Sequence, residues 1–462
     1  MKKWIFVLPI LLFLCADAEG RRVKGSVRCG TEPLEGVVVT DGRNFTLTQR
    51  NGKFVFDISD DAEFVYITTP AGYVADWSSG VPAFYIPAQG RNRFDFQLDR
   101  TQESSQYHMI AVSDPQTHSD AHFAEFSARP LEDISLTAAS FEGFGFGLML
   151  GDISWDRIEI LDMYKKEIVR AGIPFYPVVG NHDNEAYVKG DKEASASYRK
   201  KMGPENYAFR MGEEVVIVLD NIIYDTNFKC SIGYTDEVIG WVEGLLKFLP
   251  ADAGLYIAQH APLTHGNKMI INGDRLLELV RGRKVSFLSG HTHVNGNHLI
   301  EKDIRDHNVG AICGAWWDTK HCTDGTPRGY KVFTMAGDSL SWYYKPVEFG
   351  RDHIAEVFPV GGTPEYPDAI VTNVWDWDPD WKVEWYEDGV YKGAMKQISS
   401  VSAVFTSEIE AAYRAQGQEI PRWKRGRPSP HNFAAVPSPS ARIITVTVES
   451  PFGQKWSRTI AL

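Results

Sequence analysis

The amino-acid sequence predicts a central α/β domain that lies between two β domains. Short strand-like runs separated by turn dipeptides fill residues 21–100, and alternating strand-like and helix-like runs fill residues 105–345. The second pattern is typical of sheets covered by helices. Alternation of apolar and polar residues returns after residue 346, which favours strands again. We therefore divide the chain into a leader (1–18), an N-terminal β-sandwich (19–104), a central domain (105–345) and a C-terminal β-rich domain (346–462).

Turn dipeptides mark the N-terminal region. Asp41-Gly42 and Asn51-Gly52 favour the two-residue turns of β-hairpins. The runs recur about every 8–12 residues, a spacing typical of a small β-sandwich. The pattern, which includes GVVVTDG and GKFVF, resembles the carboxypeptidase-regulatory-like modules of secreted bacterial proteins. The expected strands are 23–28, 36–40, 45–48, 53–57 and 64–69.

Strands and helices alternate in the central region. In the helix expected at 155–171, Ile158, Leu161 and Ile168 recur at helical spacing, so they predict one apolar face. The expected strands are 107–112, 146–150, 173–179, 214–219, 254–258 and 285–289. The expected helices are most of 121–140, then 155–171, 235–248 and 273–281.

Tryptophans and basic residues distinguish the C-terminal region. Segments 371–389 and 441–460 each predict a β-hairpin. A tryptophan cluster at 375–385 favours either core packing or an aromatic platform for sugar or lipid, and both interpretations stay open. The basic run 422–427 predicts a solvated loop or an anion-steering patch near a site. The members of the tryptophan cluster are Trp375, Trp377, Trp381 and Trp385.

Composition and charge exclude several classes of protein. The chain has 462 residues, of which 43% are hydrophobic and 23% charged, so disordered and collagen-like chains are excluded. Its 48 basic and 60 acidic residues give a net charge of −12, which argues against a nucleic-acid-binding surface. A phosphorylated substrate is still compatible, because a bound metal reverses the local field. Five cysteines are too few for a disulfide scaffold.

The amino terminus has the features of a secretion signal. Met1-Lys2-Lys3 precedes an apolar run at 4–15, and Ala16-Asp17-Ala18 offers small residues for cleavage after Ala18. We therefore expect export to the periplasm or beyond the cell, with no transmembrane segment. Anchoring through Cys15 as a lipoprotein is the less favoured alternative, because Leu14 fits a lipobox poorly. Pairing of Cys313 with Cys322 and a pair of free thiols both stay open.

Five expected strands of the central region end in residues that bind metals or move protons. Because ligand sites in α/β sheets lie at the carboxyl ends of strands, we expect these side chains to meet. Their mixture of oxygen and imidazole donors suits Mn, Fe or Zn, with Mg also considered, rather than a thiolate site. The residues are Asp114 and Gln116, Asp152, Asn181 with His182 and Asp183, His260, and His291 with His293.

This mixture predicts a pair of divalent cations. Two cations about 3.5–4 Å apart clamp a phosphoryl group and generate hydroxide near neutral pH. One carboxylate must bridge the two cations, and Asp152, which follows the expected strand 146–150, is the natural candidate. His182 is predicted to donate a proton to the leaving oxygen, and Asp183 is predicted to orient its ring.

The motifs occur in an order that resembles a known family. Asp-x-x, Gly-Asp, Gly-Asn-His-Asp, His and Gly-His-x-His are similar to the motifs of the calcineurin-like metallophosphoesterase superfamily, in its exported bacterial three-domain type. The resemblance covers about half the chain, the central region. It implies a four-layer α/β/β/α sandwich and hydrolysis of a phosphomonoester or phosphodiester by a metal-bound hydroxide.

The resemblance also implies a role for each matching residue. Asp152 would be shared by two divalent metal ions, and His182 would be the catalytic histidine. The first metal would be held by Asp114, Asp152 and His293, and the second by Asp152, Asn181, His260 and His291.

Gln116 departs from the family pattern, which usually has His at this position. An amide oxygen can bind a metal but is a weaker ligand than imidazole, so the identity and occupancy of the first metal are left open. Asp-Pro-Gln also occurs at this point in one branch of the superfamily. His118, two residues further on, is an alternative ligand that needs a different backbone path.

Substrate contacts are less constrained by the sequence. Trp155, Trp316, Trp317 and His265 follow the motifs and are candidate pocket residues, although packing between domains explains them too. The expected substrate is a phosphorylated small molecule or an envelope-derived phosphoester. The alternative function is a non-catalytic metal-binding or glycan-binding envelope protein with a degenerate site. Oligomeric state cannot be predicted.

Overall fold

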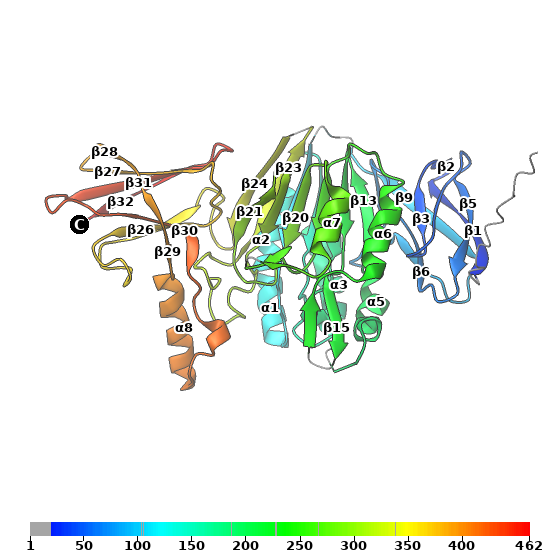
Figure 1. Cartoon of the computed structure of the whole chain (residues 1–462), viewed down its shortest axis with the longest axis horizontal. Coiled ribbons are helices and arrows are strands. Elements are labelled where there is room, and N and C mark those ends of the chain that lie inside the picture. The colour runs from blue at the N-terminus through cyan, green and yellow to red at the C-terminus, as the bar shows by residue number, and fades with distance from the viewer. Residues whose placement is uncertain are drawn as a thin grey trace, which may run out of the picture.

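The computed structural model describes residues 20–102, 104, 106–185, 187–226, 229–266, 268–337 and 339–462. The predicted leader and Cys15 lie outside these residues. Figure 1 shows three parts in a row, with the N-terminal strands at one end, an α/β part in the middle and the C-terminal strands at the other end. Within the described ranges, no helix combines the length and apolar character needed to cross a bilayer.

The N-terminal part consists of two small sheets packed face to face. One has the strand order β2-β1-β9-β7, with β5 also paired to β1, and the other has the order β4-β3-β6-β8. In β5, Phe54, Phe56 and Ile58 alternate with exposed residues, so one face of the strand enters the shared core. The strands are β1 (Gly20–Cys29), β2 (Glu32–Pro33), β3 (Val38–Thr40), β4 (Phe45–Leu47), β5 (Lys53–Ser59), β6 (Phe64–Ile67), β7 (Tyr73–Ala75), β8 (Tyr85–Pro87) and β9 (Arg93–Arg100).

The central part contains two larger sheets. The first has the order β12-β11-β10-β23-β24 and the second the order β13-β14-β17-β20-β22-β21. Strands β10, β11 and β12 run parallel, as do β14, β17, β20 and β22. The first sheet consists of β10 (Gln106–Val112), β11 (Phe144–Met149), β12 (Phe175–Pro177), β23 (Gly329–Ala336) and β24 (Ser339–Pro346). The second consists of β13 (Tyr207–Met211), β14 (Glu214–Val218), β17 (Leu255–Ala258), β20 (Val285–Ser289), β21 (Gly296–Glu301) and β22 (Ile304–Asn308).

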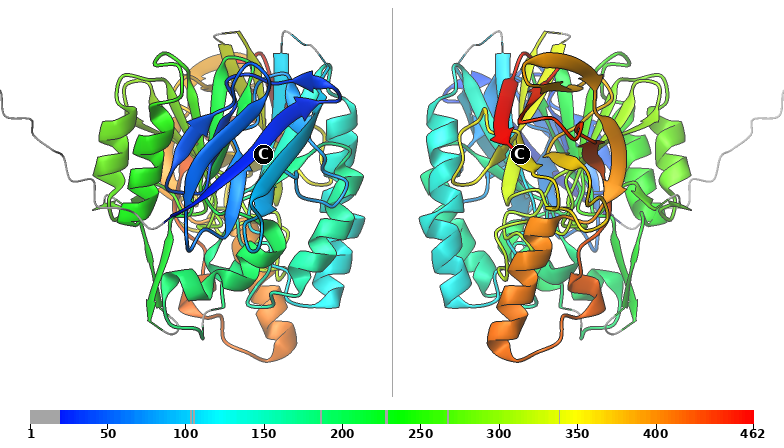
Figure 2. Two further views of the ribbon diagram at one scale, coloured as in Figure 1. Left: turned by 90° about the vertical axis from the view of Figure 1, so that its right-hand side faces the viewer. Right: turned by 90° about the vertical axis from the view of Figure 1, so that its left-hand side faces the viewer.

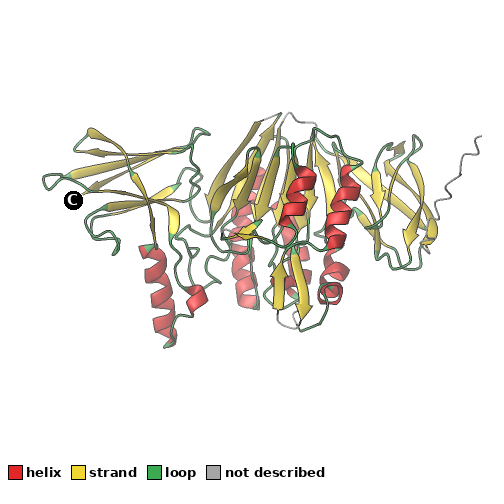
Figure 3. Cartoon of the chain, viewed as in Figure 1, coloured by secondary structure: helices red, strands yellow, loops and turns green. Residues whose placement is uncertain are grey.

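Helices cover the outer faces of both sheets, which gives four layers (Figure 3). The alternation in β10 shows why: Met109 and Ala111 pack between the sheets, whereas Ile110 and Val112 pack with α1, α2 and α3. The predicted α/β/β/α sandwich flanked by β domains is therefore confirmed. The helices are α1 (Asp120–Ala128), α2 (Pro130–Ala139), α3 (Ile160–Ile168), α4 (Asp191–Ala194), α5 (Ala196–Met202), α6 (Asp236–Leu246) and α7 (Gly273–Val280), with 3-10 turns η1 (Val169–Ala171) and η2 (Asn181–Asp183). Two short hairpins, β15 (Ile222–Thr226) with β16 (Lys229–Ile232) and β18 (Thr264–His265) with β19 (Lys268–Met269), complete this part.

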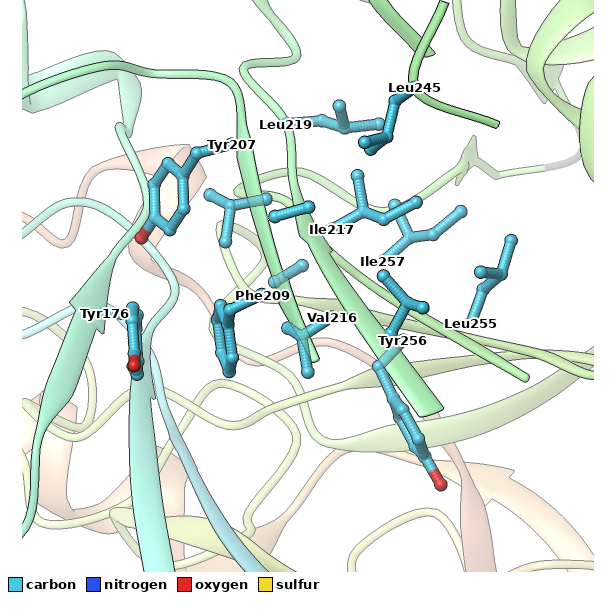
Figure 4. Close-up of a cluster of buried hydrophobic side chains, with 14 of the residues drawn as sticks. Tyr176, Tyr207, Phe209, Val216, Ile217, Leu219, Leu245, Leu255, Tyr256 and Ile257 are labelled. Atoms are coloured by element: carbon cyan, nitrogen blue, oxygen red, sulfur yellow. The ribbon is translucent and has the colours of Figure 1, made fainter. Parts of the chain in front are cut away.

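Aromatic side chains join the two central sheets. Tyr176 of the first sheet stacks on Phe209 of the second, with ring centroids 3.9 Å apart and planes 13° from parallel (Figure 4). Both rings are almost fully buried, as are Val216 and Ile217 beside them. This tight packing fixes the position of one sheet relative to the other. It therefore also fixes the position of the edge at which their strands end.

Two helix predictions differ from the structure. The region 121–140 divides into α1 and α2 at Pro130, which lacks the N–H needed to continue the first helix. The helix expected from residue 155 begins only at Ile160, because Asp156 has a left-handed backbone with φ of 53°. Residues 155–159 are therefore a loop beside the end of β11.

The C-terminal part contains two four-stranded antiparallel sheets and one long helix. Hairpin β31–β32 is confirmed, but a hairpin over 371–389 is wrong, because β26 and β27 belong to different sheets. Helix α8, capped by Ser402, was not predicted. The elements are β25 (Ala355–Phe358), β26 (Ile370–Val374), β27 (Lys382–Glu387), β28 (Val390–Ala394), β29 (Lys396–Ser400), α8 (Ala403–Gln416), η3 (Arg422–Lys424), β30 (Ser429–Ala435), β31 (Ile443–Glu449) and β32 (Lys455–Ala461).

The tryptophan cluster of the C-terminal part lies in its core. Trp381 and Trp385 are buried between the two sheets, and Trp377 packs against the same core. Trp375 is buried and stacks on His353. The structure therefore supports core packing over a platform for sugar or lipid.

The loop between β22 and β23 contains two of the cysteines. Cys313 and Cys322 are both free and fully buried, and they pack together with Ala311. Each thiol donates to a backbone carbonyl, that of Gly314 and that of Ala311 respectively. Of the two interpretations left open by the sequence, the structure has the free thiols.

A buried ion pair fastens the C-terminal part to the first central sheet. Lys331 of β23 is fully buried, and its Nζ lies 3.0 Å from Oδ1 of Asp376. The same Nζ donates to Asn297 Oδ1 at 2.6 Å. Asn295 adds a hydrogen bond to the backbone carbonyl of Trp375 at 2.6 Å. The view along the long axis in Figure 2 shows the C-terminal strands lying across the end of the central sheets.

Replacement of Lys331 by Met is expected to destabilise the protein strongly. The Asp376 carboxylate would stay buried without its cation, which costs about 3–5 kcal/mol of unfolding free energy. The matched control is Lys455→Met, since Lys455 forms an exposed ion pair with Glu449 at 3.4 Å worth about 0–1 kcal/mol. Thermal unfolding of both variants checks this, and equal losses in the two would contradict it.

Candidate metal centre

The strand ends of both central sheets bring three predicted ligands together. Asp152, His260 and His291 place their ligand atoms within 4.8 Å of one another. His260 Nε2 lies 3.3 Å from Asp152 Oδ2 and 3.1 Å from Asn181 Oδ1. His291 Nδ1 lies 3.2 Å from His260 Nε2. The four residues predicted for one metal thus form one compact group.

The remaining predicted ligands lie next to this group. His293 Nε2 is 3.6 Å from Asp114 Oδ1. Gln116 donates from Nε2 to Asp152 Oδ2 at 2.8 Å, so Asp152 is in contact with residues on both sides. His118 instead packs its ring against His122 and Trp155. Of the two candidates near the first motif, Gln116 is the one that reaches the cluster.

Several buried polar atoms of the cluster have no hydrogen-bond partner within the described chain. They are Asp114 Oδ1, Gln116 Oε1 and His293 Nε2. A buried polar atom without a hydrogen bond costs about 1–3 kcal/mol, so three in one place call for a missing partner. Two oxygens and one imidazole nitrogen, all lone-pair donors, fit a divalent cation. The residues present therefore suit a metal ion.

Backbone carbonyls orient the imidazoles. His260 Nδ1 lies 2.8 Å from the carbonyl of Leu150, and His293 Nδ1 lies 2.9 Å from that of Gly314. Because a carbonyl can only accept, each Nδ1 carries the hydrogen and donates it. Each Nε2 is then left with its lone pair facing the cluster, which is the usual arrangement of metal-binding histidines.

Five of the seven candidate ligands share an unusual backbone conformation. Asp114, Asp152, His291 and His293 all have left-handed backbones, with φ between 52° and 68°, and Gln116 has φ of 39°. L-residues other than Gly rarely adopt this region, and such strain concentrates at functional sites. The surrounding fold therefore holds these residues in place at an energetic cost.

His182 lies at the open side of the cluster and is paired with Asp156. Its Nδ1 is 2.9 Å from Asp156 Oδ1, and its side chain is 27% exposed. Its backbone N–H donates to Asp152 Oδ1 at 2.8 Å, which fixes it beside the metal ligands. Burial lowers the pKa of His182, but the carboxylates of Asp152 and Asp156 outweigh burial and leave the pKa above its ordinary value.

Asp183 has a different place from the one predicted. Its buried carboxylate accepts hydrogen bonds from the backbone N–H groups of Ile153, Ser154 and Gly180, with N···O distances of 2.9–3.2 Å. Burial, with the nearby Asp152 charge, raises the pKa of Asp183 to about 7. The residue that orients the His182 ring is therefore Asp156, and Asp183 holds the two ligand loops together. The sequence contains no motif that points to Asp156.

The predicted substrate residues divide into two groups. Trp155 lies 5.7 Å from the His182 ring and Trp316 stacks on His293 at 4.3 Å, so both border the cluster. Trp317 packs against His122 and donates from its indole to the carbonyl of Pro115. His265 lies on the exposed strand β18 and pairs with β19, and its described contacts include none of the candidate ligands.

A cavity of about 750 Å³ lies elsewhere, between the N-terminal part and the central part. Its lining includes Asp61, Glu63, Arg199 and Glu205 but none of the candidate ligands. The candidate ligands lie instead at the strand ends, where imidazoles and acidic oxygens are close enough together to hold a cation.

The chain is similar to known protein families along most of its length. Three family models match successive parts of the chain: "N terminal of Calcineurin-like phosphoesterase" at residues 21–101, "Calcineurin-like phosphoesterase" at 118–295 and "C terminal of Calcineurin-like phosphoesterase" at 306–456. No curated protein sequence matches the chain.

Solved structures with a similar arrangement are distant in sequence. A dimetal phosphatase from Danio rerio is 12% identical, with 52% of this chain and 96% of that chain covered and a TM-score of 0.38. A purple acid phosphatase from yellow lupin (Lupinus luteus) seeds is 12% identical, with coverage of 68% and 67% and a TM-score of 0.39. A 5'-nucleotidase from Candida albicans is 12% identical, with 53% of each chain covered and a TM-score of 0.33.

The family models follow one another in the order of the three structural parts. The central model spans the segment that contains the Gly-Asp, Gly-Asn-His-Asp and Gly-His-x-His motifs. With the four-layer fold and the ligand cluster, these matches show that the chain belongs to the calcineurin-like phosphoesterases, with the N-terminal and C-terminal domains of that family on either side of the central one.

Proposed function

We propose that the protein hydrolyses a phosphoester with the help of two divalent metal ions. The observation that carries this proposal is the cluster of Asp152, His260 and His291 next to the unpartnered atoms of Asp114 and His293. Membership of the calcineurin-like phosphoesterases supports metal-dependent phosphoester hydrolysis in general. The proposal further specifies two metal ions and a separate role for each residue of the cluster.

The residues of the cluster have distinct parts in this scheme. Asp152 would contact both metals, because it lies 2.8 Å from Gln116 on one side and 3.3 Å from His260 on the other. Asp114, Gln116 and His293 would complete one site, and Asn181, His260 and His291 the other. Divalent cations, when bound, offset the charge of the phosphoryl oxygens and lower the pKa of a water that they hold.

His182 is the proton donor for the leaving oxygen. Asp156 accepts the Nδ1 hydrogen at 2.9 Å, which leaves Nε2 to face the substrate. General acid catalysis of this kind contributes about 10²–10⁴-fold in rate. The hydrogen bond from the His182 backbone to Asp152 keeps the donor at a fixed distance from the metal ligands.

Metal add-back tests this function. The purified protein is stripped with a chelator and assayed with Mn, Fe, Zn or Mg added singly, using p-nitrophenyl phosphate as monoester and bis-p-nitrophenyl phosphate as diester. We expect turnover to return with at least one metal. Stoichiometric metal uptake without any turnover would instead favour a metal-binding protein without catalytic activity.

Gln116→Ala is expected to weaken the binding of one metal by about 10–100-fold, the usual cost of losing a group that orients a ligand. The variant loses both the amide oxygen and the bond that orients Asp152. Gln116→His restores a donor and is expected to bind at least as tightly as the wild type. Calorimetric titration with Mn measures both, and Gln397→Ala is the control, since Gln397 is exposed and its side-chain amide donates to the carbonyl of Pro430. Unchanged affinity in Gln116→Ala would exclude Gln116 from the site.

We also propose export of the protein, on the strength of the basic and apolar residues at its amino terminus. Fractionation of cells that express the full chain checks this, with the mature protein expected outside the cytoplasm and lacking residues 1–18.

A further inference from the structure

Three tryptophan rings connect the two sides of the candidate metal centre. Trp316 stacks on His293 with centroids 4.3 Å apart, and Trp423 meets Trp316 edge to face at 4.7 Å. Trp423 also faces Trp155 at 6.4 Å, and Trp155 lies 5.7 Å from His182. The series runs from a candidate ligand to the candidate proton donor. Its middle member comes from the C-terminal domain.

A buried lysine holds the Trp423 segment against the central domain. Lys424, the next residue in η3, forms an ion pair with Asp318. Its Nζ also lies 5.9 Å from the ring of Trp155 and 5.6 Å from that of Trp316, within the range of cation–π attraction. Because Lys424 is buried among these groups, the backbone of η3 is fixed and Trp423 is held beside the site.

Helix α8 also supports this group of tryptophans. Phe405 and Ile409 pack with the loop that contains Trp316. Glu408 accepts the backbone N–H of Lys320 at 3.1 Å. The C-terminal domain thus positions one tryptophan and supports another.

Trp423 is half exposed to solvent. Its side chain is 50% exposed, whereas Trp155 and Trp316 are partly buried. Arg427 donates to the carbonyl of Thr292, between the two ligands of the last motif, so a positive charge also lies beside the candidate metal centre. An exposed indole and an arginine at the same candidate site are suited to a molecule that has both a ring and a negative charge.

We propose that Trp423 and Trp155 bind the leaving group of the substrate, and that this group contains a flat ring, as in aryl phosphates and nucleotides. The inference rests on the proposed function, because His182 locates the leaving oxygen. A leaving group that extends away from His182 would contact Trp155 first and then Trp423. Stacking on an aromatic side chain is tolerant of the identity of the ring, so it selects this class rather than one compound.

Turnover by variants of Trp423 tests the inference. Trp423→Ala is expected to raise KM by about 5–150-fold for p-nitrophenyl phosphate and adenosine 5'-monophosphate, the range for loss of one stacked base. KM for glycerol 2-phosphate, which has no ring, is expected to rise far less. Trp423→Phe should keep most of the affinity. Tyr391→Ala, which removes an exposed ring on β28, is the matched control.

Binding of non-hydrolysable compounds gives a second measurement that is independent of turnover. By calorimetry, the metal-loaded wild type should bind benzylphosphonate more tightly than ethylphosphonate, and Trp423→Ala should remove the difference, with thermal unfolding confirming that the variant is folded. Equal binding of the two phosphonates by the wild type would overturn the inference. Continued hydrolysis of glycerol 2-phosphate would then leave the proposed function standing, whereas loss of all metal-dependent turnover would refute that function.

Discussion

Asp152→Asn is expected to reduce phosphoester hydrolysis by about 10³-fold or more and to remove metal from the protein. The side chain of Asp152 lies between Gln116 and His260, and its Oδ1 accepts the backbone N–H of His182. Asn keeps the size and tolerates the left-handed backbone, but it lacks the negative charge that the two proposed cations would share. Loss of a single electrostatic donor in an active site costs about 10²–10³-fold, and this change would affect both proposed metal sites.

The metal content and turnover of Asp152→Asn are measured on the same sample. We expect at most one metal per chain by elemental analysis, with an unchanged far-ultraviolet circular dichroism spectrum. Asp162→Asn is the control, because Asp162 lies on α3 and forms an exposed ion pair with Lys201. Full metal content together with normal turnover in Asp152→Asn would contradict a shared carboxylate at this position.

His182→Gln is expected to lower kcat by about 10²–10⁴-fold without changing the metal content. Its backbone, whose N–H and carbonyl bond to Asp152 and Ser154, stays in place, so only the ring is lost. The loss should be larger for an alkyl phosphate, whose leaving oxygen needs a proton, than for p-nitrophenyl phosphate. Asp156→Asn should show the same dependence on leaving group with a smaller loss.

Equal losses of activity by His182→Gln for alkyl and aryl esters would contradict a proton donor at His182. Loss of metal in the same variant would instead make His182 a ligand. The structure favours the donor, since the ring is paired with Asp156 rather than with the cluster.

The ligands could be predicted from the sequence because of where strands end. Asp114, Asp152, Asn181, His260 and His291 each follow a strand that is apolar enough to recognise, and parallel strands of a sheet end at one edge. The four layers were implied by the family resemblance, because the alternation of strands and helices predicted only sheets covered by helices. Local sequence pattern was therefore sufficient where the position of a residue follows from the end of its strand.

Other parts of the site depend on tertiary contacts that leave no local pattern. Asp156 reaches the His182 ring only because the chain turns back at Asp156, which has a left-handed backbone. Asp183, the residue after His182 in the sequence, points into the protein instead. Trp423 lies more than 200 residues from Trp155 along the chain and comes beside it through the packing of η3. Helix α8 was missed because a β-rich context favoured strands around it.

Titration of the metal-free protein with Mn, with bound metal and turnover measured in the same samples, tests the central claim most directly. The account predicts uptake of two ions per chain, with hydrolysis of p-nitrophenyl phosphate appearing as the second ion binds and absent from the chelated protein. Full turnover in chelated protein, or two bound ions with no turnover of any phosphoester, would contradict it.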